Sequence, residues 1–215
     1  MPRTPQTTKE IEIIKQNILE NALQIITQHG FEGFSMRRLA KRLGTTATPI
    51  YNYYTNKEEI YLKARARGFN ILYEQTRQAY DSQKEPFARM QAVTKAFIHF
   101  AVSNPQYYKI MLTWDVPMYN QFKGTPLQEV AAEVVAASRR LIDYGHRLME
   151  EMSEGYHQFT KKEVQLQYIL WITGMHGIVS LYNNTILNDL HKNPDKIINT
   201  LADRFLTLFK PPDLR

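Results

Sequence analysis

The chain has 215 residues, of which 43% are apolar, and it carries a formal net charge of +6 at pH 7. This length and composition can bury a sizeable core, and the lack of cysteine excludes a disulfide framework and a cysteine-ligated zinc site. The first residues lack the apolar stretch of a secretory signal, and the most apolar run, 168–182, is shorter than the roughly 20 residues that cross a bilayer. We therefore expect a cytoplasmic protein with no membrane span.

The positive charge is concentrated at the N-terminus. Residues 1–68 hold 11 Lys and Arg against 6 Asp and Glu, whereas residues 69–215 hold 16 against 15. A basic module on a near-neutral body is typical of proteins that contact nucleic-acid phosphates. An anionic membrane surface or an acidic protein partner is the alternative interpretation.

The first predicted helix follows a disordered arm of residues 1–8. Apolar residues recur every three or four positions from Lys9 to His29, and Gly30 then closes the helix. We expect its apolar face to supply the core against which the next two helices pack.

Two short helices are predicted next, on either side of a glycine turn. The first runs between Ser35, placed to cap it, and Gly44, where a left-handed turn costs least for a residue without a Cβ. Thr46 is predicted to cap the second helix by accepting a bond from the Thr48 amide, because Pro49 has no N–H to offer.

The second short helix has one aliphatic residue, Ile50, ten positions after Ala40. That spacing lets the two side chains meet where two helices cross steeply, as in a helix-turn-helix. The remaining side chains suit base edges and phosphates, namely Thr45, Ala47, Thr48, Tyr51 and Asn52. Four basic residues surround them: Arg37, Arg38, Lys41 and Arg42. The alternative is an ordinary corner between two helices with a solvated basic face.

Four blocks between Ile18 and Ile60 form a recognisable pattern. They are Leu39-Ala40, Leu43-Gly44, Ile50-Tyr51-Asn52-Tyr53-Tyr54 and Asn56-Lys57-Glu58. Together they resemble the N-terminal DNA-binding domain of TetR-type transcriptional regulators. The sequence departs from the usual pattern at three positions, with Ile50 for Leu, Tyr54 for Phe, and an untypical Pro49.

The resemblance assigns roles within the DNA-binding domain. It implies phosphate contacts from Ser35, Tyr51, Tyr53 and Lys57, and base-facing positions at Thr46, Ala47, Thr48 and Asn52. The full set of predicted DNA-binding residues is Ser35, Arg37, Arg38, Thr45, Thr46, Ala47, Thr48, Tyr51, Asn52, Tyr53 and Lys57.

A fourth helix is predicted over residues 57–80. Asn56 is placed to cap it, and Glu59 sits at the capping-box position. Lys57 then lies at a helix N-terminus, where backbone amides also attract a phosphate. We predict a DNA-binding domain over 1–56 and an effector-binding and dimerisation domain over 57–215, linked by this helix.

Beyond residue 80, predicted helices begin repeatedly, though not at residue 161, at a proline or at a polar residue before one, because proline at the first helical position loses no hydrogen bond. They span 86–103, 105–113, 126–153, 161–188 and 194–209. No stretch shows the alternation of a strand. The expected fold is all-α: a three-helix helix-turn-helix domain followed by a larger helical ligand-binding and dimerisation domain.

The last two predicted helices carry the strongest association signal. The helix over 161–188 is apolar nearly all round, and its two glycines each cost about 1 kcal/mol relative to alanine, which close approach of another helix would offset. The predicted dimer residues are Trp171, Gly174, Gly177, Ile178, Leu181, Leu201, Phe205 and Leu208. A four-helix bundle made by two subunits, which the TetR resemblance also implies, would place two DNA-reading helices about 34–36 Å apart. The alternative is an intramolecular core.

Large, adaptable apolar side chains are frequent in the middle of the chain and in the 161–188 helix. A cavity lined by aromatics and methionines with a few polar groups is the usual form of a small-molecule site. The predicted effector pocket consists of Phe97, Phe100, Tyr107, Met111, Trp114, Tyr144, Met149, Trp171, Met175 and His176. We expect an apolar or aromatic effector, and the alternative is that these residues are ordinary core.

Catalytic and metal-binding motifs are absent from the sequence. It contains no GxGxxG, GxxxxGK, GxSxG or HExxH, and a single Glu154-x-x-His157 motif does not complete a di-iron site. We therefore expect no enzyme activity, no catalytic or metal-ligating residue and no cofactor.

These observations support one main hypothesis. The chain is expected to be a homodimeric regulator, a repressor that binds a palindromic operator and is released when a small molecule binds. The alternative is a helical small-molecule- or metal-binding protein, or an enzyme, with an incidental basic N-terminus.

Overall fold

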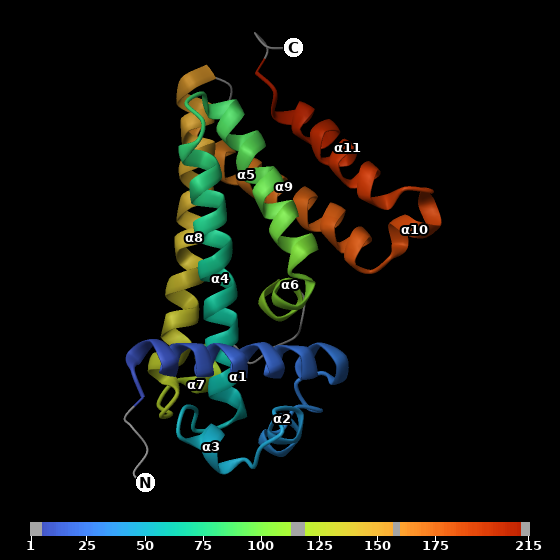
Figure 1. Cartoon of the computed structure of the whole chain (residues 1–215). Helices are drawn as coiled ribbons and strands as arrows, with labels where there is room; N and C mark the ends of the chain where they lie inside the picture. Colours follow the sequence, from blue (N-terminus) through green and yellow to red (C-terminus); the bar gives the residue numbers. More distant parts are fainter. Residues whose placement is uncertain (1–5, 113–118, 157–159, 212–215) are drawn as a thin grey trace. The chain divides into compact units, whose positions relative to one another are not determined.

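In the computed structural model, residues 6–112, 119–156 and 160–211 are described, and every regular element within these ranges is a helix (Figure 1). The predicted all-α fold is confirmed. The helices are α1 (Thr8–His29), α2 (Met36–Arg42), α3 (Thr48–Tyr51), α4 (Lys57–Asp81), α5 (Pro86–Ser103), α6 (Pro105–Leu112), α7 (Tyr119–Phe122), α8 (Gln128–Tyr156), α9 (Lys161–Asn183), α10 (Ile186–Leu190) and α11 (Pro194–Leu206), with a 3₁₀ turn at Thr207–Phe209.

Two compact units make up the chain. The head unit combines Met1–Gly68 with Gln106–Ala136, and the body unit combines Phe69–Pro105 with Ala137–Arg215. The start of α4 and the segment from α6 to the first part of α8 thus belong with the first three helices. The predicted division at residue 56 is a functional one and stays a prediction.

The head unit is built on the apolar face of α1. A capping box begins this helix, since the Thr7 hydroxyl accepts from the Glu10 amide and the Glu10 carboxylate accepts from the Thr7 amide. The helix ends at Gly30, whose φ of 71° lies in the region that favours glycine. Its buried residues pack against α2, which fixes the position of the short helices that follow.

The body unit is organised around α9, which packs against both α5 and α11 (Figure 1). The Trp171 indole donates to the Thr94 hydroxyl on α5 over 2.9 Å, and both side chains are buried. On the side of α11, the ring of Phe205 covers Gly174 so closely that an added Cβ would meet it at under 3.0 Å. The close approach predicted for Gly174 is therefore to a helix of the same unit.

Two predicted helix starts are wrong, by one residue at α3 and by two residues at α8. Thr46 does not cap α3, because the N-cap is Ala47. The Ala47 carbonyl accepts from the Ile50 amide, which is the first amide after Pro49. At α8, the Thr125 hydroxyl accepts from the Leu127 amide, so the chain forms a turn before the helix begins at Gln128.

The predicted helix over 161–188 is interrupted. It ends at Asn183, and Thr185 adopts a left-handed conformation with φ of 62°, which cannot continue a right-handed helix. The Asn183 side chain donates to the Ala101 carbonyl on α5 over 3.1 Å and fixes the helix end. The chain resumes as the short helix α10, and α7 is a further short helix that the sequence did not predict.

Candidate nucleic-acid interface

The cap and the buried face of α2 agree with the sequence prediction. The Ser35 hydroxyl accepts from the Arg38 amide over 3.2 Å, which confirms Ser35 as the cap. Leu39 and Ala40 are buried beneath the helix. The outward face of α2 therefore carries its basic side chains.

Gly44 makes the sharp turn that joins α2 to α3. Its φ is +65°, and the next amide, that of Thr45, donates to the Ala40 carbonyl over 3.0 Å. A residue with a Cβ would be strained at this position. The turn sets the direction in which α3 leaves α2.

One side chain anchors α3. Ile50 is 1% exposed, whereas Thr48 and Asn52 are exposed and make no side-chain hydrogen bond within the described residues. At about 100° per residue, Thr48 and Asn52 each lie about 20° from the direction opposite Ile50. Burial of Ile50 thus presents these two side chains to the outside, with Tyr51, 52% exposed, at one flank.

The four basic side chains of α2 fall into two pairs. Arg38 donates to the Gly33 carbonyl over 2.8 Å, and Arg42 donates to the Asn21 side chain over 3.1 Å and to Gln24. Arg37 and Lys41 are exposed and make no side-chain hydrogen bond or ion pair within the part of the chain that is described. These two cations are available to an external anion.

Two further predicted phosphate contacts lie close to α3. The Tyr53 hydroxyl donates to the Gln6 side chain over 2.8 Å, which ties the start of α1 to the end of α3. The Lys57 ammonium sits 4.4 Å from the centre of the Phe31 ring and 4.0 Å from the Glu32 carboxylate. It is thereby positioned at the N-terminus of α4.

The start of α4 is fixed by two side chains. The Asn56 side chain accepts from the Glu59 amide over 2.8 Å, which confirms Asn56 as a capping residue. The Glu59 carboxylate accepts from the amide and the hydroxyl of Thr55, at 2.6 and 2.8 Å, rather than from the Asn56 amide. The capping box is therefore shifted by one residue, and it rigidifies the turn between α3 and α4.

Comparison with known proteins identifies both parts of the chain. Residues 18–64 match the family model described as bacterial regulatory proteins of the tetR family, and residues 90–205 match that of the tetracyclin repressor-like C-terminal domain. The chain belongs to the tetR family.

Individual relatives of this tetR-family protein are distant. The uncharacterised HTH-type transcriptional regulator YobS of Bacillus subtilis is 28% identical over 102 residues, which are 47% of this chain and 53% of YobS. The HTH-type transcriptional activator FasR of Mycolicibacterium smegmatis is 25% identical over 126 residues, 59% of this chain and 54% of FasR. The chain thus spans about half the length of these curated relatives.

Solved structures show the same fold. The transcriptional regulator FadR of Bacillus subtilis, in complex with stearoyl-CoA, has a TM-score of 0.69 and 14% identity, covering 90% of this chain and 96% of FadR. At this level of identity the likeness concerns the fold.

The residues predicted for an effector pocket of this tetR-family protein are mostly buried, but they are divided between the two units. Tyr107 and Met111 belong to the head unit, Trp114 lies outside the described residues, and the others belong to the body unit. Within the body unit the His176 ring lies edge-on to Phe97 at 5.3 Å, and burial lowers the pKa of His176. The pocket itself stays a prediction.

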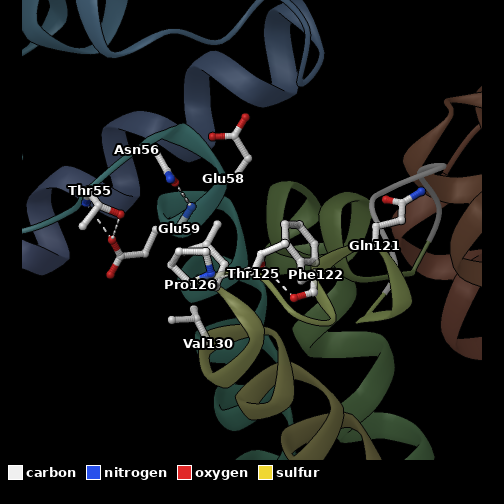
Figure 2. Close-up of a pocket in the computed structure, with 10 residues that line it drawn as sticks. Thr55, Asn56, Glu58, Glu59, Gln121, Phe122, Thr125, Pro126 and Val130 are labelled. Atoms are coloured by element: carbon white, nitrogen blue, oxygen red, sulfur yellow. Dashed lines mark hydrogen bonds between the residues drawn. The ribbon is translucent and has the colours of Figure 1, made fainter.

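An open groove of about 430 Å³ lies elsewhere, in the head unit (Figure 2). Its lining combines the start of α4, including Glu58 and Glu59, with Phe122 of α7 and apolar side chains around the start of α8, including Val130. It shares no residue with the predicted effector pocket. Groups of three or more His, Asp and Glu that could hold a metal are not found within the described ranges, and His157 lies outside them.

The predicted dimer residues are of two kinds. Trp171 is 3% exposed, and Gly174 and Phe205 pack on each other inside the body unit. A part for these three residues in a dimer contact stays a prediction. Gly177 faces open space, and Leu181 is 37% exposed.

The sequence interpretation missed two exposed leucines on α9. Leu166 is 61% exposed and Leu170 is 43% exposed. They share one helical stripe with Gly177 and Leu181, since successive members are four, seven and four residues apart, spacings that stay on one face of a helix. The signal was present in the periodicity, but a helix apolar on all sides does not reveal which face stays uncovered.

The first part of α4 is bound to the end of α6 within the head unit. The Tyr61 hydroxyl donates to the Ile110 carbonyl over 3.2 Å, and the Arg65 guanidinium donates to the Met111 carbonyl over 3.5 Å. Burial raises the pKa of Tyr61 to about 12, so this hydroxyl remains a donor at neutral pH. Both carbonyls lie in the last turn of α6 and accept from side chains of α4.

Among the described residues, each helix is too short or too polar to span a lipid bilayer.

Proposed function

We propose that this tetR-family protein is a cytoplasmic, ligand-responsive regulator that binds double-stranded DNA as a homodimer and represses transcription until a small molecule releases it. The observation that carries the proposal is the orientation of α3, which buries Ile50 and exposes Thr48 and Asn52, while Arg37 and Lys41 on α2 are exposed and have no hydrogen-bond or ion-pair partner among the described residues. Short polar side chains at base edges, flanked by cations at phosphates, are the usual composition of a major-groove reader.

Phosphate contacts supply most of the proposed affinity. Arg37 and Lys41 on α2 and Lys57 at the start of α4 are the proposed cations, and the Ser35 hydroxyl can donate to a phosphate oxygen. The Tyr53 hydroxyl would have to exchange its bond to Gln6 for a phosphate oxygen. Each neutralised phosphate releases a condensed counterion, so binding should weaken steeply as salt rises. Net charge in residues 1–68 supports this part of the proposal.

A second subunit would cover the exposed stripe of α9 formed by Leu166, Leu170, Gly177 and Leu181, here called the α9 stripe. Exposed apolar side chains in one row are a typical subunit contact. If two copies cross antiparallel near Thr173, each Leu170 faces Gly177 of the partner subunit, where there is room for it. Such a two-fold contact would present two reading helices to successive major grooves.

Release by a small molecule would act through α4. This helix carries the capped turn next to α3 and is held to the end of α6 by Tyr61 and Arg65. A ligand that favours another position of α6 would shift the population of head orientations and weaken DNA binding. The FadR structure holds stearoyl-CoA, which supports an effector with a large apolar part.

A mobility-shift assay on DNA flanking the gene for this chain tests the proposal. We expect retention of that duplex over a random duplex at moderate salt, and release when an apolar effector such as an acyl-CoA is added. Binding to neither duplex in dilute buffer would refute DNA regulation, and metal analysis of the protein would then address the alternative of a metal-binding helical protein.

A further inference from the structure

The segment from Thr45 to Asn52 carries no charged side chain, although it forms the outward surface of the reading turn. Guanine is read best by Arg or Lys, and cytosine by Glu or Asp. None of these is present on α3 or in the turn before it. Direct recognition of a G·C pair by this segment therefore lacks its usual side chains.

The side chains that are present match the edges of A·T pairs. Asn52 offers one donor and one acceptor, the arrangement that pairs with N6 and N7 of adenine. The γ-methyl group of Thr48 and the exposed ring of Pro49 are apolar surfaces of the kind that contact the 5-methyl group of thymine.

These groups are also free to act. Neither the Thr48 hydroxyl nor the Asn52 side-chain amide makes a side-chain hydrogen bond within the described residues. Ile50 points inward, and Thr48 and Asn52 both point in nearly the opposite direction. These two side chains therefore lie at the centre of the outward surface of α3.

We propose that α3 reads A·T pairs at the centre of each half-site, with Asn52 on adenine and Thr48 with Pro49 on the thymine methyl. The inference rests on the proposed function, since it names the DNA sequence class that the same surface takes. It assigns the central contacts to α3 and leaves phosphate binding to the cations on α2 and α4.

The experiment selects duplexes from a random pool with the full chain and then measures affinity on the selected site. Replacing the central thymines by deoxyuridine removes only the 5-methyl group. The expected loss is about fourfold per contacted thymine, the factor that corresponds to about 0.8 kcal/mol for one buried methyl. Replacing the central adenine by 7-deazaadenine removes the N7 acceptor and should weaken binding by about fivefold or more.

Paired variants at exposed positions tie each effect to one side chain. Thr48→Ser keeps the hydroxyl but loses the methyl group, so it should distinguish thymine from deoxyuridine less than wild type does, by the contact that Pro49 alone retains. Thr48→Val should keep the full distinction. Asn52→Ala should bind adenine and 7-deazaadenine duplexes equally.

Three results would overturn the assignment. Central G·C pairs in the selected sites, or equal thymine-to-deoxyuridine ratios for wild type and Thr48→Ser, would overturn the base reading while leaving DNA binding intact. A chain that retains no duplex even in dilute buffer would overturn the proposed function and the base reading with it.

Discussion

Two glycines on α9, three residues apart, lead to opposite predictions for the same substitution. At Gly174 an added methyl group would meet three carbons of the Phe205 ring at under 3.0 Å, whereas at Gly177 it would meet nothing within 4 Å inside the subunit. Alanine in place of helical glycine stabilises by about 1 kcal/mol. Overpacking a close contact costs about 1–3 kcal/mol.

The net effects follow from these two magnitudes. In the monomeric Leu170→Glu background, which removes the proposed subunit contact at Gly177, Gly177→Ala should raise the free energy of unfolding by about 1 kcal/mol, because only the helix preference changes. Gly174→Ala should lower it by up to about 2 kcal/mol, because overpacking of Phe205 exceeds the helix gain. In a Phe205→Ala background the obstacle is gone, so Gly174→Ala should become stabilising.

Urea denaturation at one protein concentration measures these effects in the Leu170→Glu background, because subunit association would otherwise contribute to apparent stability. The proteins compared are that parent and its Gly177→Ala, Gly174→Ala, Phe205→Ala and Gly174→Ala/Phe205→Ala derivatives. Gly177→Ala is the matched control for helix preference. The reasoning fails if Gly174→Ala stabilises as much as Gly177→Ala, or if its effect is the same with and without the Phe205 ring.

Three further predictions address the proposed interfaces and the effect of pH. Arg37→Ala should weaken binding to specific and random duplexes alike and should reduce the slope of log affinity against log salt concentration by about 1. Anisotropy titrations measure this slope, and an unchanged slope would show that Arg37 does not contact a phosphate. Leu170→Glu should convert the protein to a monomer in sedimentation analysis while its helical circular dichroism is retained, and a persistent dimer would place the contact elsewhere than the α9 stripe. Burial lowers the pKa of His176 below its ordinary 6.5, so the unfolded state binds more protons and stability falls as pH drops below about 6.5. In His176→Gln this acid loss should be smaller by urea denaturation, and an identical pH profile would contradict the assignment.

Several features of the proposed DNA-reading surface could be predicted from the local sequence alone. The helix period places Ile50 inward and Thr48 and Asn52 outward without knowledge of the fold, and the caps Ser35 and Asn56 occur where their side chains predicted them. The start of α3 was wrong because two neighbouring threonines and a proline allow more than one helix start. Only backbone angles and hydrogen bonds distinguish them.

Charge in the sequence did not distinguish free cations from bound ones. Arg37 and Arg42 are equivalent as basic residues of α2, yet Arg42 is bound to α1 side chains 18 and 21 residues away, and Arg37 is not. Pairing of this kind depends on how α1 and α2 pack.

Residue order alone determined the succession of helices, the glycine turn at Gly44 and the outward side of α3, because these depend on neighbours within about four residues. Tertiary packing decided which partner each side chain meets: Gly174 approaches Phe205 of its own unit, and Tyr61 and Arg65 reach carbonyls 49 and 46 residues away. Contacts at such separations depend on where two helices cross. The spacing of apolar residues along one helix does not predict the position of that crossing on the other helix.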